Sequence, residues 1–355
     1  MSSRDGGLME KSFTVQSHGG PYKVSFEVDF SFLDHLRERG GIWIVDRKVY
    51  DLYPKLFKVG SLLLLDATEQ EKTLTAAANL TKTLVDLGCK RNTPVISVGG
   101  GVTQDVTGFV ASMLYRGLNW TYIPTTLLAQ ADSCIGGKTS LNFDSAKNLL
   151  GTFYAPKQVY ICEAFLKTLS WQDRASGIGE IVKLFLIRSR GLEGVMEVSR
   201  LLHNPNILFQ LCDSLLIKKE FIEEDEFDNG RRKILNYGHC FGHALEAVSS
   251  FSIPHGIAVV AGMLFASIVA AKRGLIDSVM FGVLENVILI PRLHAQSFNY
   301  KDSLLNRDGL WEAMGKDKKR AGEGVAIILP RQNEEPKLFQ DLSRDEFDRA
   351  MDQLF

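Results

Sequence analysis

Short apolar runs alternate with amphipathic stretches through the first half of the chain. Stretches with helical spacing, such as 69–88, separate the runs IWIVD at 42–46, LLLLD at 62–66, PVISV at 94–98 and WTYIP at 120–124. Continuous apolar runs of this length are typical of strands that are buried on both faces. The pattern therefore predicts an α/β domain with a largely parallel sheet covered by helices.

The pattern changes beyond about residue 170, where helical spacing dominates. Few strand-like runs remain, so we expect a mainly α-helical C-terminal domain. The length of 355 residues also favours two domains with a cleft between them, which we place at 1–168 and 169–355. The late apolar run VAIILP at 325–330 is predicted to be an isolated strand that returns to the first domain. The helical stretches cover 172–190, 206–228, 236–248 and 256–273.

Composition and charge exclude several classes of protein. Lys and Arg number 41 and Asp and Glu 42, so the formal charge of −1 creates no field that would attract nucleic acid or an anionic membrane. The five cysteines lack CxxC spacing, which argues for reduced thiols. No secretory signal is visible, and the longest uncharged run, 256–271, has 16 residues and predicts a buried helix rather than a membrane span. We expect a cytoplasmic protein without nucleic-acid or membrane partners.

Three consecutive glycines, Gly99, Gly100 and Gly101, follow a predicted strand and precede a helical pattern. Free N–H groups at such a helix start bind phosphate, and glycines permit the close approach of a pyrophosphate. A tight turn without a ligand is the alternative. Asp105 is either a partner for a nicotinamide ribose or an ordinary first-turn carboxylate. Asp46, at the end of its strand, is either a ribose partner or a turn residue.

A second polar and glycine-rich stretch follows, TYIPTTLLAQADSCIGGKTSLNFDSAKN. Lys138 and Lys147 lie nine residues apart in it, with Asp132 and Asn148 nearby. Two ammonium groups with carboxylate and amide neighbours suit an anionic ligand that carries hydroxyl groups. Arg116 either joins this cluster or pairs at the surface. We interpret the stretch as a second binding loop.

The stretch RRKILNYGHCFGHALEAVSSFSIPHG, at 231–256, contains three histidines, an asparagine and two arginines. His239 and His243 are four residues apart and share one helix face, and the break before His255 allows that residue to fold back toward them. Neutral imidazoles suit zinc and similar divalent cations. An HxxxH pair alone is more often a surface or core pair, but a glycine next to each histidine favours a metal site.

Glu180 is the best candidate for a carboxylate that completes such a site. It lies in the strongly apolar helical stretch SGIGEIVKLFLI, where a buried charge needs compensation. A divalent metal would supply that compensation, and a salt bridge to Lys183 is the alternative. Lys183 and Lys218 lie on helical faces of the same domain, where they either bind phosphate or carboxylate groups or remain exposed helix charges.

Several motifs in the same order resemble one known family. These are GGGVTQDVTGFVAS, IPTTLLAQADSCIGGKTSLNF followed by AKNLLGTFY, GIGEIVK, and LNYGHCFGHALE followed by HGIAVVAGM. Together they resemble 3-dehydroquinate synthase and its sugar phosphate cyclase relatives, over about residues 42–330. The resemblance implies a dehydroquinate synthase-like fold, with an α/β N-terminal nucleotide-binding domain and a mainly α-helical C-terminal metal-binding domain.

The resemblance also implies a set of site residues. Glu180, His239 and His255 would bind the catalytic divalent metal, zinc with cobalt as an alternative, and His243 would face the substrate. Arg116 would come from a neighbouring subunit, because the family is typically dimeric. The cofactor NAD would lie near Asp46, Glu69, Lys72, Gly99, Gly100, Gly101, Asp105, Thr125, Thr126, Lys147 and Thr168. The substrate and its phosphate would be bound or acted on by Asp132, Lys138, Asn148, Lys183, Lys218, Arg232, Asn236 and one of Lys318 or Lys319.

The chemistry of this family explains why one site needs so many groups. NAD oxidises one hydroxyl of 3-deoxy-D-arabino-heptulosonate 7-phosphate to a ketone, which acidifies the neighbouring C–H so that phosphate leaves. The hydride then returns, the ring opens, and an aldol step closes the carbocycle 3-dehydroquinate. The resemblance thus implies a carbon–oxygen lyase of the shikimate pathway that regenerates NAD in every turnover.

Three departures from the family pattern bear on which substrate the protein uses. Gln104 replaces a glycine or threonine, Ala146 replaces the glycine of GKN, and Ile257 replaces an acidic residue. A related cyclase that acts on another sugar phosphate, such as sedoheptulose 7-phosphate, shares the scaffold and is the main alternative. Retention of the group Arg232, Asn236 and His243 favours the dehydroquinate synthase. Two further alternatives are a metal-dependent polyol dehydrogenase and a non-catalytic nucleotide-binding protein. The dehydrogenase would form lasting NADH, and the non-catalytic protein would have lost a metal ligand.

Overall fold

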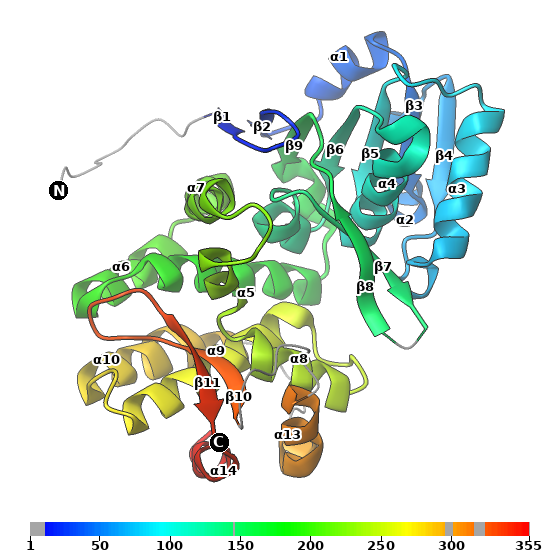
Figure 1. Cartoon of the computed structure of the whole chain (residues 1–355). Helices are drawn as coiled ribbons and strands as arrows, with labels where there is room; N and C mark the ends of the chain where they lie inside the picture. Colours follow the sequence, from blue (N-terminus) through cyan, green and yellow to red (C-terminus); the bar gives the residue numbers. More distant parts are fainter. Residues whose placement is uncertain (1–10, 145, 295–300, 316–323, 355) are drawn as a thin grey trace. The chain divides into compact units, whose positions relative to one another are not determined.

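The computed structural model describes residues 11–144, 146–294, 301–315 and 324–354. Contacts between residues divide the chain into two compact units (Figure 1). The first unit runs to Ser170 and includes Ile207–Leu215. The second contains Trp171–Asn206 and everything from Leu216 onward.

The first unit contains a seven-stranded sheet in the order β1-β2-β9-β6-β5-β3-β4. All neighbouring strands are parallel except β1 and β2, so the predicted parallel sheet is confirmed. Every residue of β5 is buried, as expected for a central strand of such a sheet. The strands are β1 (Ser12–Val15), β2 (Tyr22–Glu27), β3 (Ile42–Asp46), β4 (Ser61–Leu65), β5 (Val95–Gly99), β6 (Trp120–Pro124) and β9 (Gln158–Cys162).

Helices cover both faces of this sheet. On one face, Trp43 and Val98 pack in an apolar cluster with Leu33 of α1 (Phe32–Glu38) and Val49 of α2 (Arg47–Leu52). Ser97 alternates with those positions and hydrogen bonds to α4 (Gly101–Met113), which therefore covers the opposite face together with α3 (Leu74–Asp86). The remaining elements are the hairpin β7 (Lys138–Phe143) and β8 (Ala146–Phe153) and the short helices η1 (Pro54–Phe57), η2 (Glu69–Glu71), η3 (Leu114–Arg116), η4 (Ala129–Ser133) and η5 (Glu163–Thr168).

The second unit is mainly α-helical, as predicted. Its central helix, α9 (His255–Lys272), is surrounded by the other elements and ends where Gly274 adopts a left-handed φ. By length and composition alone α9 could cross a membrane, but 83% of its apolar window is buried inside the protein, as in a core helix. The other elements are α5 (Trp171–Arg188), α6 (Gly191–Leu202), α7 (Ile207–Glu224, which spans both units), η6 (Arg231–Asn236), α8 (His239–Val248), α10 (Ser278–Val283), η7 (Leu284–Leu289), α11 (Ile290–His294), α12 (Lys301–Leu305), α13 (Arg307–Gly315) and α14 (Arg344–Met351).

The late apolar run forms a strand, but its predicted return to the first domain is wrong. β10 (Val325–Leu329) pairs antiparallel with β11 (Lys337–Leu342), and the two form a separate two-stranded sheet within the second unit. The partner strand follows after a short turn, so local pairing costs little loop-closure entropy. The charged residues of β11, in the sequence KLFQDL, hide it from a search for apolar runs.

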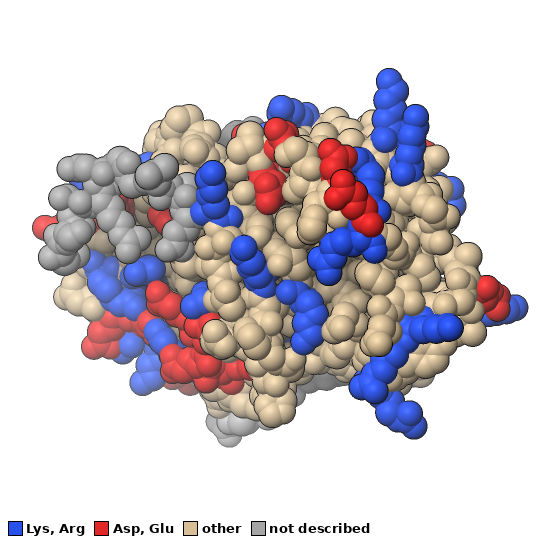
Figure 2. Space-filling model, turned by 90° about the horizontal axis from the view of Figure 1, so that it is seen from above, with Lys and Arg blue, Asp and Glu red and all other residues tan. Residues whose placement is uncertain are grey.

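Charged side chains of both signs occur on the face drawn in Figure 2. Lys and Arg stand singly or in small groups among uncharged residues, and Asp and Glu lie beside several of them. This distribution agrees with the balance of 41 basic and 42 acidic residues in the sequence.

Glu346 provides a pH-dependent contribution to the stability of the second unit. Its carboxylate accepts hydrogen bonds of 2.7 and 2.8 Å from the Arg273 guanidinium, and it closes a capping box with Ser343 at the start of α14. The Arg273 bonds are the main cause that lowers the pKa of Glu346 from 4.5 to about 2. A depressed pKa in the folded state contributes stability above pH 4.5 that is lost as the pH falls toward 2.

We therefore expect Glu346→Gln to lower the free energy of unfolding by about 1–2 kcal/mol at neutral pH, after allowance for partial solvent screening. The glutamine can keep the capping box through its single acceptor oxygen, and it loses the charge and one of the two Arg273 bonds. Urea unfolding should show this difference shrinking as the pH is lowered from 5 toward 3, whereas Asp345→Asn, in an exposed ion pair with Arg349, should change stability little. A difference that stays constant with pH would contradict the role of the charge.

Candidate active site

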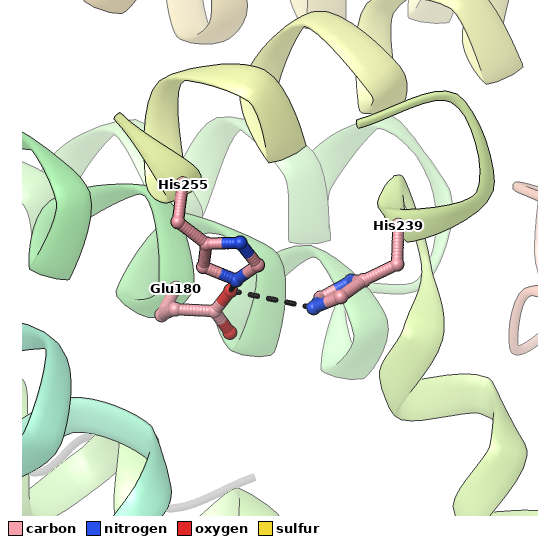
Figure 3. A group of neighbouring side chains, drawn as sticks. All are labelled: Glu180, His239 and His255. Atoms are coloured by element: carbon pink, nitrogen blue, oxygen red, sulfur yellow. Dashed lines mark ion pairs between the residues drawn. The ribbon is translucent and has the colours of Figure 1, made fainter. Parts of the chain in front are cut away.

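Three helices of the second unit bring one glutamate and two histidines together. Glu180 lies within α5, whereas His239 and His255 are the first residues of α8 and α9. Nε2 of His255 lies 3.2 Å, and Nε2 of His239 3.6 Å, from Oε1 of Glu180. Figure 3 shows the three side chains pointing toward one another, and their possible ligand atoms all lie within 4.8 Å of each other. This arrangement suits a single divalent cation with an open coordination position.

Glycines allow the three helices to approach so closely. A Cβ on Gly256 would lie 2.0 Å from the carbonyl oxygen of Ser176, and one on Gly179 would lie 2.2 Å from that of Gly256. Gly238 has a left-handed φ of +79°, and a Cβ there would lie 2.6 Å from the carbonyl oxygen of Val259. Each of the three candidate ligands thus has a glycine next to it in the chain. Main-chain contacts therefore set the distances between the ligands.

Both histidines are oriented through their second ring nitrogen. Nδ1 of His239 lies 3.2 Å from the carbonyl oxygen of Tyr237, and Nδ1 of His255 lies 3.2 Å from Oε2 of Glu246. Each oxygen accepts a hydrogen bond, so these partners assign the proton to Nδ1 in the neutral imidazole. When both imidazoles are neutral, as metal binding requires, the lone pair of each Nε2 points toward Glu180, whereas a protonated His255 donates from Nε2 to Oε1 of Glu180. Such orientation by a carbonyl or a carboxylate is usual for histidines that bind metals.

The charge balance of this group favours an ionised Glu180. Burial alone would raise the pKa of Glu180, but the ion-paired Lys183 ammonium and then the histidines hold it well below its usual range. Burial, followed by the nearby Lys183, keeps the pKa of His239 well below 6.5. Burial also disfavours charge on His255, but its contacts with Glu180 and Glu246 outweigh that effect and raise its pKa to about 10.

The donor set fits a divalent cation of zinc type. Two imidazole nitrogens and one carboxylate are its usual ligands when one position stays open. Neither carboxylate oxygen of Glu180 has a well-aligned hydrogen bond within the described part of the chain, although both are buried. A carboxylate in this position needs nearby positive charge, of which Lys183 supplies one unit and a divalent cation would supply more. The metal site itself stays a prediction, to which the geometry adds support.

A cavity of about 510 Å³ adjoins the cation group within the second unit. His239, His243 and Asn236 line it, so the structure brings two of the predicted catalytic residues next to a candidate metal ligand. The His243 ring lies one turn beyond His239 on α8, with the two ring centroids 5.1 Å apart. An exposed imidazole at this edge can exchange a proton with a bound molecule.

Three of the predicted anion-binding cations are buried in the structure. Lys183, Lys218 and Arg232 are 2%, 5% and 4% exposed. The alternative that Lys183 and Lys218 are exposed helix charges is therefore wrong, and the reason is that α5 and α7 are enclosed by other elements. The predicted salt bridge between Lys183 and Glu180 is present, and it is compatible with a cation site because both groups lie in the same cluster.

A loop before η6 fixes the main chain of Arg232. The Asp225 carboxylate accepts hydrogen bonds from the backbone N–H groups of Asn229, Gly230 and Arg232, at 2.9, 2.7 and 3.0 Å. Three such bonds hold the loop as a closed turn. The guanidinium of Arg232 also donates to the carbonyl oxygen of Glu226. Arg232 is therefore held from both its main chain and its side chain.

The glycine loop of the first unit has the predicted strand, turn and helix. β5 ends at Gly99, Gly100 is the extended N-cap, and α4 begins at Gly101. A Cβ on Gly99 would lie 2.3 Å from Oγ1 of Thr103, and one on Gly100 would lie 3.1 Å from Cγ2 of Thr126. No side chain caps this helix, and the buried Thr103 hydroxyl has no hydrogen-bond partner among the described residues. An uncapped helix start suits a phosphate group, whereas the Thr103 hydroxyl is enclosed against Gly99.

A polar network lies at the side of this loop. Lys72 Nζ is 2.6 Å from Oδ2 of Asp105 and donates at 2.5 Å to Oδ1 of Asn148, while Ser140 donates to both Asp105 oxygens at 3.0 Å. Burial raises the pKa of Asp105, and Lys72 and Ser140 oppose that change. Glu69 joins through Asn142, at 2.8 Å. The predicted cofactor residues Glu69, Lys72 and Asp105 thus lie together, and Asn148, predicted for the substrate, belongs to the same network.

Lys138 and Lys147 do not form one cluster, so their predicted grouping is wrong, whereas the binding role of the second loop stays a prediction. Lys138 opens β7 opposite Phe153, whereas Lys147 is the second residue of β8, near the other end of the hairpin. Strand geometry separates the two ends by roughly 16 Å. The hairpin, which was not predicted, is the physical reason. Asp132 lies outside the hairpin in η4.

The remaining predicted residues lie at several places. Asp46 accepts a hydrogen bond of 2.9 Å from the Lys48 N–H as the N-cap of α2, which agrees with the turn interpretation. The Thr168 hydroxyl pairs with that of Tyr53 at 2.9 Å. Arg116 has a left-handed φ of +62°. It lines a separate cavity of about 550 Å³ together with Arg91 and other residues of the first unit.

Thr125 and Thr126 follow β6 and lie directly beside Gly99 and Gly100. Lys318 and Lys319 lie outside the described residues.

Sequence reasoning missed several residues that support the site. Glu246 lies three residues after His243 on the helix, so the spacing HxxxHxxE could have identified it. Asp225 precedes an Asp-Asn-Gly turn, which is a usual place for a carboxylate that binds main-chain N–H groups. Gln104, noted only as a departure, is buried and forms two hydrogen bonds of 2.6 Å with Ser133 of η4. No sequence pattern predicts that last contact.

We expect Glu246→Ala to weaken divalent-cation binding by about 10- to 100-fold, because the substitution removes the oxygen that orients His255. Glu246→Gln keeps an acceptor oxygen and should retain most of the affinity. Competition with a zinc-binding dye measures both. Equal affinities of the wild type and Glu246→Ala would show that His255 needs no such partner.

The fold and the site define the class of the protein. An α/β unit with a glycine loop and a helical unit with a Glu/His/His cluster are the parts of a two-domain enzyme fold. The family model described as 3-dehydroquinate synthase N-terminal matches residues 62–176, and that described as 3-dehydroquinate synthase C-terminal matches 177–320. The chain belongs to the 3-dehydroquinate synthase family and is an enzyme, so the resemblance seen in the sequence is confirmed.

Individual relatives agree with this assignment. The chain is 33% identical over 343 residues to a protein of Dictyoglomus thermophilum named 3-dehydroquinate synthase, covering 93% of this chain and 94% of the relative. A solved structure of ValA, a 2-epi-5-epi-valiolone synthase from Streptomyces hygroscopicus with NAD⁺ and Zn²⁺ bound, has a TM-score of 0.80 at 24% identity, with 94% and 96% coverage. A 2-deoxy-scyllo-inosose synthase complexed with carbaglucose-6-phosphate, NAD⁺ and Co²⁺ has a TM-score of 0.81 at 22% identity, with 96% and 99% coverage. The predicted fold class is thereby confirmed.

Proposed function

We propose that this protein is a 3-dehydroquinate synthase, which converts 3-deoxy-D-arabino-heptulosonate 7-phosphate to 3-dehydroquinate and phosphate. The observation that carries the proposal is the convergence of Glu180, His239 and His255, with buried cations in the same unit. The named relative, similar over nearly its whole length, supports this substrate. NAD and a divalent cation, zinc or cobalt, are the proposed cofactors, in line with those bound in the two similar structures.

The residues divide the work according to their chemistry. Glu180, His239 and His255 would hold the cation, and the glycine loop with Lys72 and Asp105 would hold NAD. When bound, the cation polarises substrate oxygens and NAD accepts and later returns a hydride. These two groups supply chemistry that no side chain of the chain can supply.

The cationic side chains of the second unit would bind the anionic ends of the substrate. Lys183, Lys218 and Arg232 are buried, so their attraction to a phosphate or carboxylate is little screened by solvent. Arg232 can form two parallel hydrogen bonds, which fixes the orientation of the anion. A polyol carries no such anion, so these residues weigh against a polyol dehydrogenase.

Two residues at the cavity would complete the reaction. His243 can receive and return a proton, because its imidazole is exposed at the cavity edge. Asn236 can donate a hydrogen bond to a substrate oxygen without changing charge. We also propose a homodimer in which Arg116 serves the partner subunit. The main chain of Arg116 is strained, its side chain is exposed, and it lines a basic cavity of its own unit.

The test is to offer 3-deoxy-D-arabino-heptulosonate 7-phosphate with NAD and zinc, and to identify the product by mass. We expect 3-dehydroquinate and equimolar phosphate without lasting NADH absorbance. Lasting NADH would indicate a dehydrogenase instead.

A cyclase with another sugar phosphate is the second candidate. Gln104 favours it, because this buried side chain fixes η4, which carries the predicted substrate residue Asp132. Failure with the first substrate and turnover of sedoheptulose 7-phosphate would move the assignment to such a cyclase.

A further inference from the structure

A tyrosine hydroxyl lies directly beneath the glycine loop. Tyr122 belongs to β6, is fully buried, and stands opposite Ser97 of the adjacent strand β5. Its hydroxyl is 3.1 Å from the carbonyl oxygen of Gly99 and 3.1 Å from that of Gly100. One proton is thus shared between the carbonyls of two successive peptides.

The hydroxyl is not needed to satisfy these carbonyls. Gly99 O also accepts from the Thr125 N–H at 3.0 Å, and Gly100 O accepts from the Gln104 N–H at 3.1 Å. Both oxygens would therefore keep a partner if the hydroxyl were removed, and little stability would be lost. The role of the two Tyr122 bonds must therefore lie in the direction that they give to the two peptide planes.

Peptide planarity converts this contact into a direction for the loop. In a trans peptide the C=O of one residue and the N–H of the next point in opposite directions. Holding the carbonyls of Gly99 and Gly100 toward Tyr122 therefore turns the N–H groups of Gly100 and Gly101 away from it. These N–H groups lie at the uncapped start of α4. Three glycines have no side chains to restrict their own main chain, so the direction depends on outside contacts, and Tyr122 adds one bond to each of those from Thr125 and Gln104.

We propose that Tyr122 is a positioning residue, which holds the glycine loop so that the N–H groups of Gly100 and Gly101 face a bound pyrophosphate. This inference rests on the proposed use of NAD. Burial raises the pKa of Tyr122 well above 10, so the hydroxyl stays protonated and remains a donor throughout the physiological range.

Tyr122→Phe removes the hydroxyl and little else. We expect the NAD dissociation constant, measured by calorimetry, to rise about fivefold, in line with the net value of one hydrogen bond. Turnover at saturating NAD and the melting temperature should stay close to those of the wild type. ADP-ribose, which contains the pyrophosphate, should lose affinity to the same extent, whereas adenosine should not.

Two further variants separate positioning from a general structural effect. Tyr154→Phe, which removes a hydroxyl bonded to the Leu118 carbonyl at 2.9 Å in the same unit, should bind NAD as the wild type does. Tyr122→4-aminophenylalanine keeps a donor and should restore affinity.

Four outcomes would overturn the inference. Wild-type affinity of Tyr122→Phe for NAD would refute it alone. A large loss of melting temperature, or equal losses for adenosine and ADP-ribose, would mark Tyr122 as structural only. Absence of NAD binding by the wild type would refute the proposed function, and this inference with it.

Discussion

Glu180→Gln is expected to abolish turnover and to weaken divalent-cation binding by about a thousandfold or more. The substitution keeps the shape of the side chain but removes the charge that two imidazole nitrogens cannot replace. The loss should exceed that of Glu246→Ala, since Glu180 is a direct candidate ligand whereas Glu246 acts through His255. Zinc titration and phosphate release measure the two effects.

The same substitution should destabilise the metal-free protein by about 3 kcal/mol, because Lys183 stays buried without its ion-pair partner. A double variant, Glu180→Gln with Lys183→Met, also removes the ammonium group that faced the Glu180 carboxylate and should recover most of the stability without recovering cation binding. Glu193→Gln, on the exposed face of α6, is the control for loss of a carboxylate. Wild-type cation affinity in Glu180→Gln would remove this residue from the proposed metal site.

Gly256→Ala is expected to cost about 3 kcal/mol or more of folding stability. Its Cβ would lie 2.0 Å from the carbonyl oxygen of Ser176 and 2.6 Å from its Cα, and these main-chain atoms can move only if α5 and α9 separate. Separation would also draw His255 away from Glu180, so cation affinity should fall with stability. Denaturant unfolding and zinc titration on the same preparation test both effects.

Gly282→Ala is the matched control for this prediction. Gly282 lies in α10 of the same unit, and a Cβ there would meet nothing within 4 Å. Alanine has the higher helix propensity, so this variant should be neutral or more stable by up to about 1 kcal/mol. If Gly256→Ala were equally harmless, the close contact of α5 and α9 would not determine the geometry of the site.

Local patterns were enough to predict the elements that carry the site. Apolar runs identify the strands around β5, and three glycines identify the turn before α4, because both depend on neighbours in sequence. Glu180 could be selected because a carboxylate in an apolar helix is costly wherever that helix packs. The candidate metal ligands His239 and His255 each stand beside a glycine whose Cβ would meet main-chain atoms of a neighbouring element.

The predictions that failed concern features that depend on which strands and side chains meet in space. The separation of Lys138 and Lys147 follows from the register of a hairpin whose strands are too polar to be recognised. The pairing of β10 depends on β11, whose alternation is interrupted by charged residues and a bulge. The contact of Tyr122 with two glycine carbonyls joins an apolar strand to a turn, and residue spacing contains no information on it.

The glycines beside Glu180, His239 and His255 have a consequence for how this protein can change. Main-chain atoms look alike in every amino acid, so the geometry they impose survives when the surrounding apolar residues of α9 are exchanged for others of similar volume. The residues that line the cavity can then change while the positions of Glu180, His239 and His255 are inherited unaltered. Laboratory evolution should likewise randomise the cavity lining and leave Gly179, Gly238 and Gly256 untouched.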